Sequence, residues 1–527
     1  MKLDPETLDV TLEQLHAVVE RGCQQPLDSE GRRMLSALID TIGQMARMLA
    51  DKDTKLSQLR RMLLKPSTTE KTRVVLERAG IKPEPKQTAE KKGRKGHGRK
   101  PASAFPGALK VEVNHPTLNT GDRCPECNKG KLYPLKEPGV RMRIVGQAPV
   151  QATVYELERL RCNACQQVYE APAEQAGNSK RDETAASMVV LLKYGSGMPF
   201  YRLAGLQANL GIPVPPSTQW DMVGQAAAPA RPAYEELIRQ AAQDGVLYND
   251  DTGSRILSLQ RETGGGRTGV FTTGVVSTQA GRKIALFFSG DKHAGENLAD
   301  VLKKRRAGLP PPIQMCDALN RNTPKGFAVI LSNCLAHCRR KYVDVAASFA
   351  PQCQYVLEIL GKVYQHDEQA RQQEMNDEQR LAHHQARSGP LMEELKKWGR
   401  KQLDDHEVEE NSELGRAIRY MLNHWEPLTL FLRVARAPLD SNLVERTLKK
   451  AILHRKNALF YKTRNGARTG DMFMSLIHTC ELNGGNPFDY LNELQRHAAE
   501  VERDPAQWMP WNYRETLEKM AATGKAA

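Results

Sequence analysis

The sequence has no long apolar run, no export signal and few cysteines. A membrane-spanning helix needs about 18 consecutive apolar residues, and no stretch of the chain approaches that length. The opening residues, MKLDPETLDV, are too acidic and too polar for a signal peptide. Ten cysteines in 527 residues do not make a disulfide framework and are expected to be reduced. We therefore predict a cytoplasmic protein with no membrane partner.

The composition is that of a globular protein with an excess of positive charge. Hydrophobic residues make up 40% and charged residues 26%, which argues against a disordered or fibrous chain. At roughly 100–200 residues per domain, this length corresponds to three or four folded units. The 76 Lys and Arg exceed the 62 Asp and Glu, giving a net charge of +14. The excess favours a polyanionic partner, although a merely soluble surface would also account for it.

Residues 1–66 are predicted to form an N-terminal helical segment with a coiled coil over 35–63. Apolar residues recur every seven positions from Leu35 to Leu63, and a second row starts three residues later at Leu38. This a/d pattern is sustained over four heptads and is interrupted only by Lys52. A homodimer or higher oligomer is the preferred interpretation. A single amphipathic helix packed on its own domain is the alternative.

Residues 67–104 are predicted to form a basic, flexible linker. The run over 91–100 has no apolar side chain and cannot build a core. Its cations can bind DNA phosphates in a salt-sensitive and sequence-independent way. A solvated linker without a DNA role fits the run equally well. The candidate DNA-binding residues are Lys91, Lys92, Arg94, Lys95, Arg99 and Lys100.

Residues 105–175 contain two CxxC pairs, Cys124 with Cys127 and Cys162 with Cys165. Four thiolates at this spacing can close one tetrahedral, structural Zn²⁺ site. The segment between the pairs alternates apolar and polar residues, as the short strands of a zinc ribbon would. We predict a zinc ribbon, with redox-active cysteine pairs as the competing interpretation.

Residues 183–243 have helical spacing interrupted by Gly and Pro. A helix reaching Lys193 is followed by a second that stops at Gly211 and a third that opens with Ser217 as its N-cap. The arrangement resembles a helix-turn-helix, with the third helix as the candidate DNA reader. An ordinary helical bundle is equally consistent with the pattern.

Residues 244–345 change to strand periodicity. Strands are predicted over 246–259, 269–278 and 283–289, followed by a helix over 296–304 and a further strand over 312–316. This is the RNase H-like order, in which the first and fourth strands lie side by side. Asp250 lies on the first strand and Asp317 directly follows the fourth. A carboxylate in an apolar strand is costly to bury unless it is paired or binds a metal, so both acids are candidate site residues. The alternative is that Asp317 merely starts a turn.

Residues 346–430 are predicted to be an all-helical insertion. Just before it, Cys334, His337 and Cys338 share one predicted helix face and could hold a metal. A packed thiol pair beside a hydrogen-bonded histidine is the commoner arrangement.

Residues 431–485 are predicted to complete the core with a helix that starts near Glu445, and residues 486–527 form a C-terminal segment. Asn442 as N-cap, with Glu445 three residues later, would form a pair like a capping box. In the functional interpretation, Glu445 instead projects toward Asp250 and Asp317, and the cations after it attract DNA phosphates. These cations are Arg446, Lys449, Lys450, Arg455 and Lys456.

In this order, the features resemble the insertion sequence 66 family of bacterial DDE transposases over nearly the whole chain. The resemblance includes the zipper, the basic linker and the paired CxxC segment. Three further blocks carry it: Leu247-Tyr248-Asn249-Asp250-Asp251-Thr252, Cys334-x-x-His337-x-Arg339-Arg340-Lys341, and Asp440-x-Asn442-x-x-Glu445-Arg446 ahead of Arg455-Lys456-Asn457. The tail, with Asn486-Pro487-Phe488 and Met509-Pro510-Trp511-Asn512, is also similar to that family.

The resemblance implies a multi-domain α+β fold with an RNase H-like α/β catalytic core. Asp250, Asp317 and Glu445 would form the catalytic triad and hold two Mg²⁺ or Mn²⁺ ions, with Asn442 and His337 in support. The implied enzyme is bacterial and nucleoid-associated, binds terminal inverted repeats and target DNA, and cleaves and joins DNA strands, with accessory proteins from the same element as further partners. A catalytically inactive DNA-binding protein on the same scaffold is the alternative.

Two positions depart from the family pattern. Asp251 stands where the family usually has Glu, which makes it a rival to Asp250 for the first catalytic position. Ala318-Leu319-Asn320 follows Asp317, where the family usually has Gly and an aromatic residue.

Overall fold

The structure is a computed structural model that describes residues 108–135, 146–172, 179–260 and 269–524, together with positions 31, 74, 75, 77, 105, 140 and 144. The chain divides into two compact units, one of residues 84–151 and the other of residues 1–83 with 152–527. The predicted coiled coil over 35–63 and the basic run over 91–100 lie outside the described residues, and both stay predictions.

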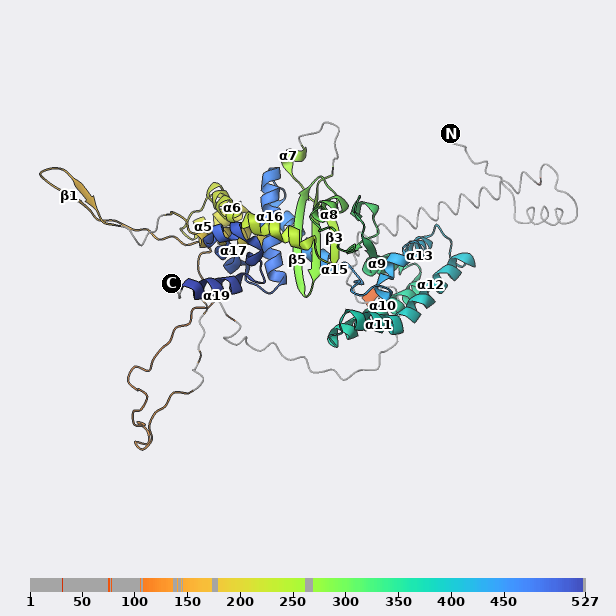
Figure 1. Cartoon of the computed structure of the whole chain (residues 1–527), viewed down its shortest axis with the longest axis horizontal. Coiled ribbons are helices and arrows are strands. Elements are labelled where there is room, and N and C mark those ends of the chain that lie inside the picture. The colour runs from red at the N-terminus through yellow and green to blue at the C-terminus, as the bar shows by residue number, and fades with distance from the viewer. Residues whose placement is uncertain are drawn as a thin grey trace. The chain divides into compact units, whose positions relative to one another are not determined.

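A five-stranded mixed sheet lies in the larger unit (Figure 1). The strands are β3 (Val246–Gly253), β4 (Phe271–Gln279), β5 (Arg282–Gly290), β6 (Ile313–Cys316) and β7 (Ile330–Asn333), with α8 (Ala294–Leu302) between β5 and β6. The spatial order is β5-β4-β3-β6-β7, in which β3, β4 and β5 are antiparallel while β3, β6 and β7 are parallel. The predicted α/β core of three strands, a helix and a further strand is therefore confirmed.

The strands differ from the prediction at two places. The first strand does not extend to residue 259 but ends at Gly253, and the short helix α7 (Leu257–Gln260) follows it. The fifth strand, β7, was not predicted. It is only four residues long and pairs in parallel with β6.

Helices cover both faces of the sheet at β4. On one face, the Asn297 side chain of α8 donates a hydrogen bond of 2.8 Å to the Thr273 hydroxyl. On the other face, α15 (Asn442–Ala458) packs over Gly274, the next residue of β4. Because successive residues of a strand face opposite sides, both faces are covered here, and six consecutive residues of β4 are buried.

The outer edge of β5 is covered by α16 (Arg464–Leu482). Polar side chains spaced four residues apart along the chain accept hydrogen bonds from alternate backbone N–H groups of β5. The acceptors are Asp471, Ser475, Thr479 and Asn483, and the donors are Ser289, Phe287, Ala285 and Lys283. Four helical residues rise about 6 Å and two strand residues about 6.7 Å, so the two spacings match. The helix thus pairs an edge that would otherwise be open to another strand.

Helices from two distant parts of the sequence pack together beside the sheet. One set comprises α4 (Glu183–Val190), the π-helical turn η3 (Leu191–Gly195), α5 (Phe200–Asn209) and α6 (Pro216–Ala241). The other comprises α17 (Pro487–Arg496), α18 (Ala498–Arg503), η6 (Pro505–Trp508) and α19 (Tyr513–Gly524). Gln495 donates to the Ser187 hydroxyl at 2.8 Å, and Arg496 pairs with Glu183 at 2.6 Å. The helices over 183–243 and the C-terminal segment are therefore one packed body.

The boundaries within 183–243 require one correction. The second helix ends before Gly211, whose positive φ of 76° suits a helix end. The third helix does not have Ser217 as its N-cap. Pro215 is the N-cap and Pro216 the first helical residue, a position at which proline loses no hydrogen bond.

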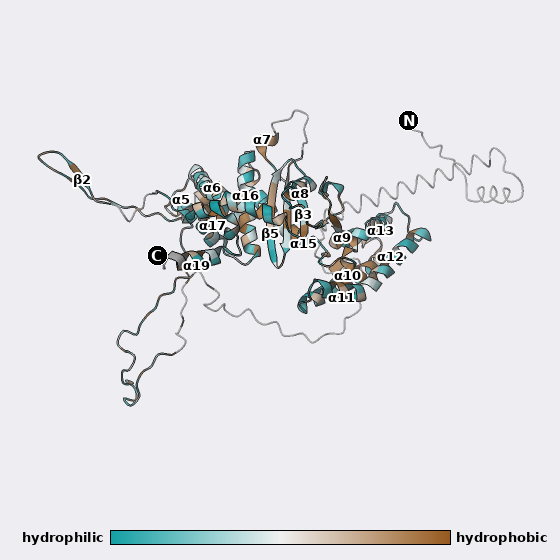
Figure 2. Cartoon of the chain, viewed as in Figure 1, coloured by the Kyte–Doolittle hydropathy of each residue, from teal (hydrophilic) through white to brown (hydrophobic). Residues whose placement is uncertain are grey.

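The region between β7 and α15 is helical. Its elements are α9 (Leu335–Val345), α10 (Ala350–Gln372), α11 (Asp377–Arg387), α12 (Gly389–Asp404), α13 (Glu413–Asn423), α14 (Trp425–Leu428) and η5 (Leu430–Leu432). The short turn η4 (Asn320–Asn322) lies between β6 and β7. The apolar core of these helices is continuous with Val246 of β3 and Ile313 of β6. In Figure 2 hydrophobic residues are concentrated around β3 and α9. Among the described residues, no helix combines the length and apolar character of a membrane span.

Each CxxC pair lies in a tight turn between two paired backbone segments. Cys162 and Cys165 lie between the antiparallel strands β1 (Arg159–Arg161) and β2 (Val168–Glu170). An antiparallel bridge between Arg123 and Lys131 likewise encloses Cys124 and Cys127. In both turns the residue after the second cysteine has a positive φ, 53° for Asn128 and 65° for Gln166. The two turns belong to different units of the chain, so the structure describes each by itself.

Candidate active site

Asp250 and Asp317 lie at the same level of two adjacent parallel strands. The register of β3 with β6 pairs Tyr248 with Met315, and each acid lies two residues further along its strand direction. Asp317 follows directly after β6 ends, at the carboxyl edge of the sheet. The alternative that Asp317 only starts a turn does not account for this placement, although its carboxylate does accept hydrogen bonds from the Leu319 N–H and the Asn322 amide.

Asp250 is held in a largely buried environment beside other charged groups. Burial and, to a smaller extent, the nearby Asp317 carboxylate raise the pKa of Asp250 to about 6. Two groups act in the opposite direction: the Asp251 N–H, which donates to Asp250 at 2.8 Å, and the His337 side chain. A cation in this site would offset the cost of burying the Asp250 carboxylate in its charged form. It would also reduce the repulsion between Asp250 and Asp317.

Glu445 is carried to the sheet by the amphipathic helix α15. The buried side chains of this helix are spaced by three or four residues and comprise Val444, Thr447, Leu448, Ala451 and His454. That face packs on β3 and β4, with Leu448 lying over Gly274. Glu445 follows Val444 in the first helical turn and is only partly exposed, at 19% of its side-chain surface. The packing of this helix face on the sheet thus fixes where the Glu445 carboxylate lies.

The expected N-cap at Asn442 is wrong. Ser441 is the N-cap residue, and its hydroxyl donates to Glu445 Oε1 at 3.0 Å. The Asn442 side chain instead donates to Asp440 Oδ2 at 2.6 Å, so its amide is engaged with Asp440. Asn442 was predicted to support the site, but its side chain contacts Asp440 and not Glu445. Ser441 contacts Glu445 directly.

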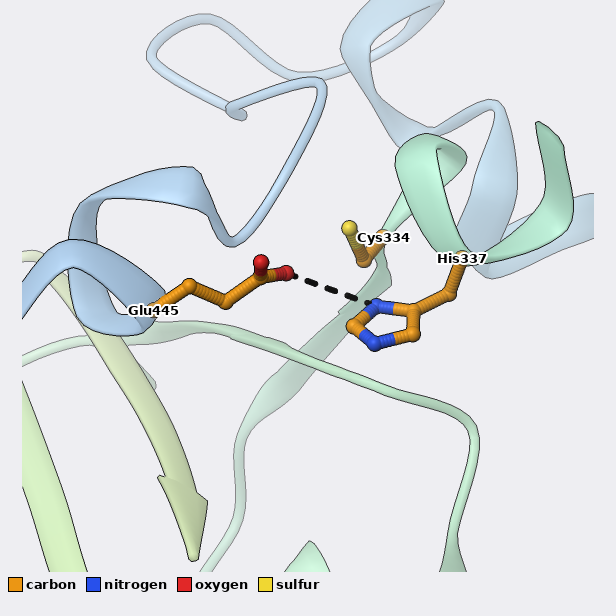
Figure 3. A group of neighbouring side chains, drawn as sticks. All are labelled: Cys334, His337 and Glu445. Carbon is orange, nitrogen blue, oxygen red and sulfur yellow. Dashed lines mark ion pairs between the residues drawn. The ribbon is translucent and has the colours of Figure 1, made fainter. Parts of the chain in front are cut away.

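His337 and Cys334 lie beside Glu445 (Figure 3). His337 Nδ1 is 3.9 Å from Glu445 Oε1. The Cys334 sulfur raises the pKa of His337 to about 9, and the Glu445 and Asp317 carboxylates contribute to the same shift. Of the two sequence alternatives, the metal group of Cys334 and His337 with Cys338 is wrong in its third member. Cys338 is fully buried, which raises its thiol pKa to about 12, and Glu445 takes its place beside the other two.

Asp251 faces the opposite side of the sheet from Asp250. Its carboxylate is 3.2 Å from His293 Nδ1, at the start of α8, and 3.4 Å from Arg321 Nη2. Only 3% of its side chain is exposed. Since neighbouring strand residues point to opposite faces, Asp251 cannot share the side occupied by α15. The geometry favours Asp250 over its rival.

Within the described part of the chain, one group of three potential metal ligands has all its donor atoms within 4.8 Å of one another: Cys334, His337 and Glu445. Asp250, Asp317 and Glu445 do not form so tight a group. Two metal ions about 3.5–4 Å apart allow the acids that bind different ions to be further apart than this. Neither Asp250 nor Asp317 forms an ion pair with a described residue, so each retains oxygen atoms for a cation.

Exposed cations follow Glu445 along α15. Arg446, Lys449, Lys450 and Lys456 are exposed on the side away from the sheet. Lys450 pairs with Glu481 at 3.2 Å. Arg455 is partly buried and donates to the Thr252 hydroxyl of β3 at 3.3 Å. Four of the five predicted DNA-binding cations of this helix are thus presented to solvent, and the fifth connects the helix to the strand of Asp250.

Three residues of the site were not predicted from the sequence. Ser441 contacts Glu445, Gly274 makes room for α15, and Tyr420 of α13 lies beside the backbone of Ala318, next to Asp317. Ser441 had a local signal, because serine is as good an N-cap as asparagine. Gly274 and Tyr420 had none, since each acts through a contact far away in the sequence.

The two cysteine turns share an electrostatic feature. Backbone hydrogen bonds from Gly130 and Lys129 lower the pKa of Cys127. Those from Cys165 and Ala164 lower the pKa of Cys162. Turns that direct N–H groups at a sulfur favour the thiolate, which is the form that binds metals.

Comparisons with known proteins identify the family of this chain. The model of the Transposase IS66 family matches residues 179–469, a range that contains Asp250, Asp317 and Glu445. The uncharacterized protein y4jD of Sinorhizobium fredii is 27% identical over 410 residues, which cover 74% of this chain and 78% of y4jD. The uncharacterized protein y4hP of the same organism is 25% identical over 430 residues, covering 77% of this chain and 76% of y4hP. The chain belongs to the IS66 family of transposases.

Proposed function

We propose that this chain is a DDE transposase that cleaves and joins DNA at the ends of a bacterial insertion sequence. The observation that carries the proposal is the packing together of the elements that bear three acids far apart in the sequence. Asp250 and Asp317 lie at the same level of adjacent parallel strands, and the helix bearing Glu445 packs on the sheet over Gly274, the residue that pairs with Asp250. With its α/β sheet, this is the arrangement expected of an RNase H-like nuclease.

The acids suit hard divalent cations. All their donor atoms are oxygens, which Mg²⁺ and Mn²⁺ prefer, and Asp250 and Asp317 have no protein cation bound to them in the described residues. When bound, two such ions would activate the attacking oxygen and stabilise the leaving oxygen of a phosphodiester. Asp250 would hold both, with Asp317 and Glu445 completing one ligand shell each. Ser441 holds the Glu445 carboxylate in place for this role.

The chain itself binds and orients DNA. Arg446 directly follows Glu445, so a phosphate bound to it would lie near that acid, and Lys449, Lys450 and Lys456 would hold phosphates further along the helix. The run over 91–100 would add a sequence-independent attraction. The nucleophiles would be water and then the exposed 3′-hydroxyl, so no serine or tyrosine is assigned a covalent role.

Recognition of terminal inverted repeats is assigned to the parts outside the sheet. The helices over 183–243 would act as a helix-turn-helix, the coiled coil over 35–63 would pair two ends through a homodimer, and the four cysteines would bind one Zn²⁺ in a ribbon. Each turn by itself lowers the pKa of one of its thiols, which suits a metal ligand. Metal analysis of the purified protein tests this assignment. Cys127→Ser is expected to contain one zinc ion fewer per chain than wild type.

A cleavage assay tests the catalytic assignment. Wild-type protein with Mg²⁺ or Mn²⁺ is expected to cut terminal-repeat DNA, whereas Asp250→Asn, Asp317→Asn and Glu445→Gln should each lose at least about 100-fold in rate. Asp405→Asn and Glu502→Gln, at exposed positions away from the site, are matched controls that should retain activity. Equal cleavage by all variants would exclude the triad. Salt-sensitive DNA binding without cleavage in any protein would identify an inactive DNA-binding protein instead.

A further inference from the structure

The group formed by Cys334, His337 and Glu445 differs chemically from the three acids. Its donors are a sulfur, a ring nitrogen and a carboxylate oxygen, all within 4.8 Å of one another (Figure 3). Cys334 is the N-cap of α9, His337 lies in the first turn of that helix, and Glu445 lies in the first turn of α15. Two helix starts therefore bring the three donors together.

The backbone holds the Cys334 sulfur in position. The Cys334 N–H donates to the Cys316 carbonyl at 3.0 Å, and the Leu335 N–H donates to the Leu439 carbonyl at 2.9 Å. The sulfur itself accepts the N–H of Ser441 at 3.2 Å. Cys334 is 0% exposed. Contacts to β6 and to the segment before α15 thus fix the thiol relative to Glu445 before any ligand binds.

His337 contributes a ring nitrogen that faces Glu445 but forms no hydrogen bond. Its Nδ1 is buried from solvent and has no hydrogen-bond partner. The atom lies 3.9 Å from Glu445 Oε1, beyond hydrogen-bond distance. Buried polar atoms without a hydrogen bond are rare in folded proteins, and an ion between nitrogen, sulfur and carboxylate would bind this nitrogen directly.

We propose that these three residues bind a zinc ion, and that this ion inhibits DNA cleavage. A thiolate and an imidazole select zinc over magnesium, and three protein ligands leave one position for water. Glu445 is the only residue shared with the proposed catalytic triad. If a zinc ion on the Cys334 side bound the Glu445 carboxylate, that carboxylate could no longer bind the ions held by Asp250 and Asp317. The inhibitory part of this inference rests on the proposed function, whereas the zinc site does not.

Zinc binding is measured on the full-length protein by equilibrium dialysis with Zn²⁺. Wild type is expected to bind one more zinc per chain than Cys334→Ser or His337→Gln. Cys338→Ser is the matched control, since Cys338 is equally buried on the same helix but lies outside the group. It should bind as many zinc ions as wild type. Equal zinc binding by all four proteins would overturn the site.

Inhibition is measured by titrating Zn²⁺ into Mg²⁺-dependent cleavage, with each protein compared with its own zinc-free rate. The zinc concentration for half inhibition should rise at least about 10-fold in Cys334→Ser and in His337→Gln, and stay within about twofold in Cys338→Ser. Zinc binding without inhibition, or with activation, would overturn the inhibitory role. If wild type cleaves no DNA at all, the proposed function fails, while the dialysis still decides whether the zinc site exists.

Discussion

Leu448 lies where the side chain of residue 274 would be. A Cβ atom added to Gly274 would be 3.0 Å from two carbons of Leu448 and 3.3 Å from Val444. Gly274 pairs directly with Asp250 across the β3–β4 ladder. The absent side chain on β4 therefore sets how closely the helix bearing Glu445 approaches the strand bearing Asp250.

Replacing Gly274 should separate the acids without removing any of them. Gly274→Val is expected to push α15 outward, lower stability by about 1–3 kcal/mol and reduce cleavage at least about 10-fold. Gly290→Val is the matched control, because nothing lies within 4 Å of a Cβ there. Melting temperature and cleavage rate together check the prediction, and full activity of Gly274→Val would contradict it.

Asp251 should prove structural and Asp250 catalytic. Asp251 contacts His293 and Arg321 on the α8 side of the sheet, so Asp251→Asn is expected to cost about 1–3 kcal/mol of stability. Its cleavage rate should stay within about threefold of wild type, whereas Asp250→Asn should lose at least about 100-fold. Denaturation curves and cleavage rates for the two neighbouring variants decide between the acids. The reverse ranking of rates would assign the first catalytic position to Asp251.

Ser441 should influence metal binding through Glu445. Because its hydroxyl donates to Glu445 Oε1 at 3.0 Å, Ser441→Ala leaves that carboxylate less well oriented. The Mg²⁺ concentration for half-maximal cleavage is expected to rise about 3- to 10-fold, the size of one lost hydrogen bond. Ser441→Thr keeps the hydroxyl and should restore a value near wild type. An identical Mg²⁺ dependence for serine and alanine would show that the hydrogen bond has no such role.

The strand order and the first two acids could be predicted because their signals are local. Short apolar runs bounded by glycine or charge mark the strands, and the positions of Asp250 and Asp317 relative to those runs place them at the sheet edge. The four-residue strand β7 was missed because so short a run carries little periodic signal. Its role depends on pairing with β6, which no local pattern encodes.

The start of α15 could not be settled locally, because Ser441 and Asn442 are both good N-caps. Asp440 decides between them by binding the Asn442 amide. The packing of the C-terminal segment on α4 and α6 was equally hidden. Gln495 and Ser187 are 308 residues apart, and the amphipathic pattern of a helix does not identify its partner. The placement of Glu445 was predicted by resemblance, while the contacts that Ser441 and Gly274 provide for it and its helix required the folded chain.

The contact of Asp471 with β5 predicts a pH-dependent stability. Asp471 is buried and accepts hydrogen bonds from the Ser289 N–H and hydroxyl. Burial raises the pKa of Asp471 to about 7, because the Ser289 hydrogen bonds and the Arg468 charge, which lower it, offset only part of the effect. An ordinary aspartate has a pKa near 3.9, so the folded state holds a proton that the unfolded state releases between about pH 4 and 7. Stability from this residue is therefore greatest at low pH and falls as pH rises through about 7.

Asp471→Asn should remove that dependence. Asparagine keeps an acceptor for the Ser289 N–H and carries no charge, so the variant should match wild type near pH 4.5 and exceed it at pH 8, by an amount on the order of 2–4 kcal/mol. Asp405→Asn, at an exposed position, should leave the difference between the two pH values unchanged. Urea denaturation followed by circular dichroism at both pH values measures the effect. A variant less stable than wild type at pH 8 would mean that Asp471 is ionised and stabilised by its hydrogen bonds, which would make the α16–β5 contact depend on charge.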